Sequence, residues 1–138
     1  AAPAPIAIKS FHAHIYFRSP DERSHALQLR EWIGERFSVQ LGRVHEVPVG
    51  PHSQAMYQIA FAREVFEPLV SFLMVQHGAL SVLVHPNTGR ARDDHLSHAI
   101  WLGEPLPVRG DTLSNEPKDD VISPVVPNTT PKSAAVKA

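Results

Sequence analysis

The sequence predicts an α+β domain in which two helices cover one face of an antiparallel sheet. Strand-like and helix-like segments alternate along the chain, and the first strand has one apolar and one polar face. The chain has 138 residues, of which 43% are hydrophobic and 20% charged, as in an ordinary globular protein. We expect a domain over residues 11–109, a lead-in over 1–10, and a polar, proline-containing, flexible tail over 110–138.

The first strand is predicted from strict alternation in FHAHIYF, residues 11–17. Successive side chains of a strand point to opposite faces of the sheet. One face therefore carries only apolar groups and should pack against the helices. The opposite face carries His12, His14 and Tyr16.

A helix is predicted directly after this strand. Ser19 can cap it, Pro20 suits its first turn, and Glu22 completes a capping box. Apolar residues then recur at helical spacing. They are Ala26, Leu29, Ile33 and Phe37, and the helix should end near the last of them.

The remaining elements give the order β-α-β-β-α-β. We expect strands at 43–49 and 56–62 joined as a hairpin, a helix at 64–77 and a strand at 80–85. This order is that of a ferredoxin-like βαββαβ sandwich, an antiparallel sheet with two helices on one face. We expect its first and last core strands to run antiparallel without being neighbours. The other face stays open for a site, a partner chain or a covering segment.

Composition excludes several function classes. There is no cysteine, so any metal must be bound by nitrogen and oxygen. The net charge of −1 gives no sign of nucleic-acid binding, and no apolar run approaches a membrane span. The first ten residues do not resemble a signal peptide, so we expect a soluble, cytoplasmic protein.

Histidine is the unusual residue, with nine in the chain. Alternation places His12 and His14 on one face, roughly 6.5–7 Å apart along the strand. Two imidazoles at this spacing can bind one metal ion. The alternative is an ordinary pair of histidines on a solvated or interfacial sheet face.

Other histidines can join this pair. His85 ends the last core strand, and its alternation favours the same face, although a strand-end histidine can simply bond backbone. A short helix over 93–98 would place His95 and His98 on one side. His52 lies in a Gly-Pro turn and could act as an acid or base, although a lone histidine is more often structural.

Four strings resemble one known family. They are HAHIYF at 12–17, VGPHSQAMYQIAF at 49–61, VHPNTG at 84–89 and DHLSHAIWLG at 94–103. In this order, over about residues 11–107, the chain resembles a bacterial-type member of the DOPA 4,5-dioxygenase family. The turn at 50–53 reads Gly-Pro-His-Ser, where a second proline is expected after the histidine.

The resemblance implies a ferredoxin-like fold, non-haem Fe(II), O₂ as co-substrate and a catechol such as DOPA, in an extradiol ring cleavage. Another divalent ion such as zinc is an alternative occupant in the purified protein. We assign His52 and His98 to catalysis, because reactive groups are often presented by loops. The expected metal ligands are His12, His14, His85 and His95.

A carboxylate ligand is less easily placed, because no acidic residue lies inside the strand motif. Asp94, Glu46 and Glu104 are candidates, and a site made only of histidines is the alternative.

Two other functions remain open. One is a non-enzymatic ferredoxin-like protein that binds a metal or small ligand as a dimer. The other is a metal-dependent isomerase or hydrolase with the same histidines. We expect a homodimer, with no nucleic-acid or membrane partner.

Overall fold

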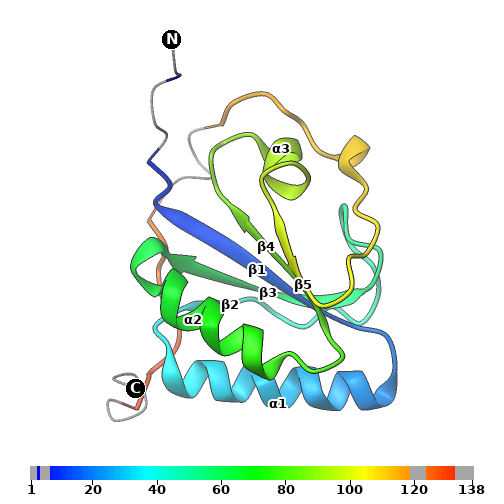
Figure 1. The fold of residues 1–138 in the computed structure, drawn as a ribbon, viewed down its shortest axis with the longest axis vertical. Helices are drawn as coiled ribbons and strands as arrows, with labels where there is room; N and C mark the ends of the chain where they lie inside the picture. The colour runs from blue at the N-terminus through cyan, green and yellow to red at the C-terminus, as the bar shows by residue number, and fades with distance from the viewer. Residues whose placement is uncertain (1–2, 4–6, 119–123, 133–138) are drawn as a thin grey trace.

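The computed structural model describes residues 3, 7–118 and 124–132. A five-stranded antiparallel sheet with the order β2-β3-β1-β4-β5 is covered on one side by two long helices (Figure 1). This confirms the predicted α+β class. The elements are β1 (Ser10–Phe17), α1 (Pro20–Arg36), β2 (Gln40–Leu41), β3 (Ala55–Ala62), α2 (Arg63–Gln76), β4 (Ser81–Pro86), α3 (Ala91–His95), β5 (Ile100–Leu102) and the 3₁₀ turn η1 (Gly110–Thr112).

The main core lies between the sheet and the helices α1 and α2. Helix α1 begins as predicted, with the Ser19 side chain accepting a hydrogen bond from the backbone N–H of Glu22. Apolar side chains of β1, β3 and β4 meet apolar faces of both helices in one buried cluster. Its fully buried members include Ala13, Ile15, Leu29, Ile33, Ile59, Leu69, Leu73 and Val82. No helix in the described part of the chain is both long and apolar enough to cross a membrane.

The expectation that the first and last core strands are not neighbours is wrong. Strand β1 pairs with β4 along most of its length, with β3 on its other side. His12 lies directly opposite His85 in the β1–β4 register. Adjacent strands place opposite side chains within a few ångströms of each other. The pairing therefore brings histidines that are far apart in the sequence together on one sheet face.

The predicted strand at 43–49 is also wrong. Strand β2 is a two-residue pair with β3, and the chain from 42 to 54 is mainly loop. One isolated bridge, His45 with Met56, remains of the expected hairpin. Pro48 has no N–H to donate and Gly50 has φ 55°, so both interrupt a strand ladder. The loop carries His52 instead to an isolated bridge with Val108.

The sheet face opposite α1 and α2 has two different halves. Around Tyr16 it is covered by a second apolar cluster, in which Met56 and Leu83 are buried under Trp101 and Val108. The half nearer the start of β1 is covered by α3, which lies on this side of the sheet (Figure 1). The face predicted to be open is therefore covered at both ends, by the second apolar cluster at one end and by α3 over the histidines at the other.

Candidate metal centre

Five histidines from four segments converge beneath α3. His12 and His14 come from β1, His85 from β4, His52 from the loop before β3, and His95 from the end of α3. Their ring centroids form a continuous cluster, with separations from 4.0 Å for His85–His95 to 6.0 Å for His12–His14. Strand alternation predicted the first pair, and the β1–β4 pairing adds His85.

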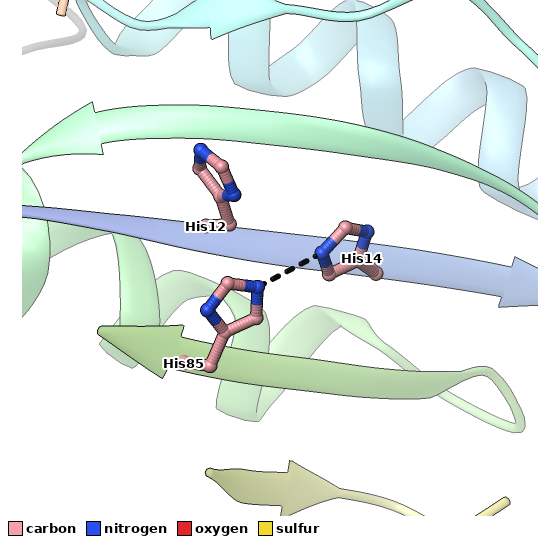
Figure 2. Close-up of side chains that lie close together, drawn as sticks. All are labelled: His12, His14 and His85. Atoms are coloured by element: carbon pink, nitrogen blue, oxygen red, sulfur yellow. Dashed lines mark hydrogen bonds between the residues drawn. The ribbon is translucent and has the colours of Figure 1, made fainter. Parts of the chain in front are cut away.

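His14 and His85 form the centre of this cluster. Their Nε2 atoms lie 3.1 Å apart, and both side chains are buried (Figure 2). His12 projects from β1 on the same side, with its ring 5.1 Å from that of His85. One nitrogen from each of these three residues lies within 4.8 Å of the other two, which is a spacing suited to a metal ion.

A second set of three ligand atoms overlaps the first. His14, His52 and His95 also offer nitrogens within 4.8 Å of one another. A neutral imidazole has a single lone pair for a metal, so His14 can serve only one of the two sets. The two sets therefore describe alternative arrangements around one centre, and His52 is placed as well for ligation as for catalysis.

Hydrogen bonds to backbone fix the tautomers of two rings. The Nδ1–H of His85 donates to the carbonyl of Pro86 at 2.9 Å, and that of His95 donates to Ala91 at 2.8 Å. A carbonyl can only accept, so in each neutral ring Nε2 carries the lone pair. Such outer hydrogen bonds are typical of histidines that bind metals.

The cluster favours neutral imidazoles. Burial, followed by the neighbouring His95, lowers the pKa of His12 to about 4, while Asp94 opposes this shift. Burial and nearby histidines also lower the pKa of His52 to about 4, and burial lowers that of His95. The pKa values of His14 and His85 fall well below the ordinary value for the same reasons. These rings are thus ready to ligate without first losing a proton.

His98 lies apart from the five. It follows α3 rather than belonging to it, so His95 and His98 do not share a helical face. Its Nδ1–H donates to Asp94 at 2.9 Å, and it lines a second, mainly apolar hollow with Phe11 and Ile100, to which His85 is the only contributor from the cluster among the described residues. The structure therefore does not bring together His52 and His98, the two residues assigned to catalysis.

The three candidate carboxylates have other partners. Asp94 is buried and accepts hydrogen bonds from the backbone N–H and hydroxyl of Thr88, besides His98. Glu46 pairs with Arg23, and Glu104 with Arg18, at the surface. Within the described residues, neither set of three ligands includes a carboxylate. The geometry favours the all-histidine alternative.

Sequence reasoning missed the role of Tyr16. Its hydroxyl lies 2.6 Å from Nδ1 of His52, and its ring stacks on Trp101. Burial raises the pKa of Tyr16, so the phenol stays neutral. A neutral phenol can donate to the imidazole or accept from it. The signal was present in the alternation, which placed Tyr16 on the same face as His12 and His14.

Comparison with known proteins assigns the family. The model of the Dopa 4,5-dioxygenase family matches residues 11–112. This chain belongs to that family. It is 37% identical over 124 residues to a DOPA 4,5-dioxygenase from Amanita muscaria, covering 83% of this chain and 53% of that protein. An uncharacterised 21.2 kDa protein from Botryotinia fuckeliana is 37% identical over 110 residues, covering 72% of this chain and 60% of the relative. The chain thus spans little more than half the length of either relative.

A solved structure supports the same assignment. A protein from Nostoc punctiforme, provisionally described as a dioxygenase, has a crystal structure that matches with a TM-score of 0.74 and 44% identity. The match covers 76% of this chain and 90% of that one.

The residues of this Dopa 4,5-dioxygenase family member fit a bound metal. Two nitrogens about 2.1 Å from one ion and at right angles lie roughly 3.0 Å apart, close to the 3.1 Å between His14 and His85. Without an ion, His14 must donate its Nε2–H to His85, whose Nε2 can only accept. The Nδ1 lone pair of His14 is then buried, and it has no hydrogen-bond partner. Such an orphaned polar atom is costly. A shared metal would engage both facing Nε2 lone pairs at once, although the Nδ1 of His14 would then carry the ring hydrogen and still lack a partner.

Proposed function

We propose that this chain is a metal-dependent, extradiol-type dioxygenase that opens the ring of a catechol such as DOPA. The observation that carries the proposal is the opposed pair His14–His85, in a chain of the Dopa 4,5-dioxygenase family. Buried polar atoms in proteins are nearly always paired, and a metal ion between these two neutral imidazoles would engage both facing nitrogens at once. His85 lines a cavity of about 320 Å³ together with His12 and His95. This volume is large enough for a small aromatic ligand.

We propose His14 and His85 as the central ligands, with His12 and His95 completing the set. Three of these four rings project from strands β1 and β4, which hold the side chains rigidly. The bound ion, which we take to be Fe(II), supplies a centre on which both catechol oxygens and O₂ can meet. A site made of imidazole nitrogens would also accept other divalent ions such as zinc.

His52 is proposed to accept the proton that a catechol hydroxyl loses on binding. Its ring is buried beside His14, with ring centroids 4.2 Å apart, and Nδ1 contacts the Tyr16 hydroxyl. Tyr16 can therefore hold the His52 ring in one orientation whichever of the two carries the shared hydrogen. This proton returns to the product during ring opening, so the reaction neither releases nor takes up a proton. Both atoms of O₂ remain in the product.

His98 is proposed to contribute indirectly. Its bond to Asp94 and the bonds from Asp94 to Thr88 tie α3 to the turn that follows β4. His85 and His95 lie at the two ends of this connection. We therefore propose that His98 positions the segment that carries His95, rather than exchanging protons with the substrate itself.

The proposal is tested by loading the protein with Fe(II) without oxygen, adding a catechol, and then admitting ¹⁸O₂. We expect a yellow ring-opened product heavier than the substrate by both labelled atoms, with one O₂ consumed per substrate. Stoichiometric catechol binding without turnover would instead support a non-enzymatic binding protein. Turnover without oxygen uptake would indicate another enzyme class, such as an isomerase or hydrolase.

A further inference from the structure

The C-terminal segment forms one wall of the histidine-lined cavity. Pro124 and Val125 line it together with His12 and His95. These two residues lie beyond the region matched by the family model, which ends at residue 112. The cavity is thus built partly from the region that the family model matches and partly from a segment outside it.

This wall is held to the edge of the sheet by several hydrogen bonds. The side-chain amide of Asn128 donates to the Leu41 carbonyl at 3.0 Å and accepts from the Leu41 N–H at 2.8 Å. Thr129 accepts from the N–H of Val39, and the Lys132 N–H donates to Glu35. In Figure 1 this orange-red stretch runs beside β2 and the end of α1. The predicted tail is therefore attached over 124–132, where Asn128 pairs with the β2 edge as another strand would.

Among the residues that the structure describes, the cavity lining carries one acid, Asp94, and is otherwise without charged groups apart from its histidines. Val125, Pro124, Ala60 and Ala91 give it an apolar surface, and the described lining includes no lysine or arginine. Its neutral polar members are Ser10, Gln40 and Asn87. The carboxylate of Asp94 already accepts hydrogen bonds from Thr88 and His98. A carboxylate on the substrate would lose its hydration here without gaining a cation.

We propose that this chain prefers catechols whose ring substituent is uncharged, with Val125 in contact with that substituent. The inference rests on the proposed function, because it takes the cavity beside the histidines to be the substrate site. It narrows that function, since the amino-acid group of DOPA carries a carboxylate that this lining does not match. Val125 is only partly buried and Val126 is 71% exposed, so the first faces the cavity while the second faces solvent.

The test compares 4-propylcatechol with 3-(3,4-dihydroxyphenyl)propionic acid, which differ mainly by a carboxylate. Affinity is measured by calorimetry without oxygen, and kcat/KM with oxygen, on the Fe(II)-loaded protein. We expect the wild type to favour the propyl compound by about tenfold or more. Val125→Arg should reduce this ratio about tenfold, since it places a cation at the substituent. Val126→Arg, the matched control, adds the same charge one residue away and should leave the ratio unchanged.

The outcomes separate this inference from the proposed function. If neither compound is cleaved but the affinities follow the expected order, the dioxygenase proposal fails and the wall assignment stands. Equal affinities in the wild type, or equal shifts from both arginine variants, would overturn the assignment even if cleavage occurs. Asn128→Ala is a second test, because it removes the hydrogen bonds that hold this wall to Leu41. It should speed hydrogen exchange at the Leu41 amide and also reduce the preference for the propyl compound. Faster exchange with an unchanged preference would also overturn it.

Discussion

The Nε2 atoms of His14 and His85 lie 3.1 Å apart at the centre of the buried histidine cluster. His85 donates through Nδ1 to Pro86, so its Nε2 can only accept. The pair can therefore make one hydrogen bond at most, and it leaves the Nδ1 of His14 without a partner. A metal ion bound by both rings would engage the two facing Nε2 lone pairs at once, in place of this single hydrogen bond.

Substitution of either member of this pair should abolish tight metal binding. We expect His14→Ala and His85→Ala to weaken Fe(II) or Zn(II) affinity by roughly 100-fold or more, beyond the 10–100-fold typical of losing an outer partner. Metal content after dialysis, measured by mass spectrometry, checks this. His77→Ala is the matched control, because that ring bonds the Leu80 carbonyl far from the cluster. Equal metal retention by all three variants would remove the His14–His85 pair from the site.

The stability of the metal-free protein should fall as the pH is lowered from about 6.5 to about 4. Folded His12 and His52 have pKa values of about 4, against 6.5 for the free side chain. Between these values the unfolded chain binds more protons, so acid favours unfolding. Each histidine contributes a slope of up to about 1.4 kcal/mol per pH unit, and the loss levels off below the folded pKa.

Urea denaturation with a chelator present, at several pH values from 4 to 8, checks this sign. His52→Gln should reduce the slope, because it removes one of the titrating groups. An unfolding free energy that is constant or rises toward acid pH would show that the rings are not held neutral.

Truncation of Asp94 should destabilise the fold. The carboxylate accepts hydrogen bonds of 2.8 and 2.6 Å from Thr88 and one of 2.9 Å from His98. Asp94→Ala leaves these donors unpaired in a partly buried region, so we expect a loss of about 2–4 kcal/mol in unfolding free energy. Asp93→Ala, which removes a single side-chain hydrogen bond from Asn115 at a less buried aspartate, should cost less than about 1 kcal/mol. Equal losses in urea denaturation would contradict the central role given to Asp94.

The sequence predicted those parts of the fold and site that follow from local periodicity. Alternation in β1 placed His12, His14 and Tyr16 on the face away from the helices, and capping residues located the start of α1. It did not predict the pairing of β1 with β4, because strand order depends on packing between distant segments. The contact between His14 and His85 follows from that pairing and not from either motif alone.

Loops limited the rest of the prediction. The segment at 43–49 has strand-like composition, yet Pro48 and Gly50 leave only a bridge at His45. Helical spacing suggested a shared face for His95 and His98, but α3 ends at His95 and the second ring turns to Asp94. Nothing in the periodicity of the sequence indicates that His52 would reach the cluster. Its position depends on the whole path of a loop.

The last prediction separates proton transfer from metal binding at His52. This ring belongs to one of the two candidate ligand sets and also contacts the Tyr16 hydroxyl at 2.6 Å. If it carries protons, His52→Ala should keep Fe(II) near wild-type occupancy and lower kcat by roughly 10²–10⁴-fold. Tyr16→Phe, which keeps the ring and removes the hydroxyl, should also retain metal and lower kcat by less.

His98→Ala should have a smaller effect on kcat than His52→Ala, because that ring lies outside the cluster and acts through Asp94. Iron analysis and single-turnover rates on the same samples decide the matter: loss of iron from His52→Ala, with iron retained by His85→Ala, would reverse the two roles.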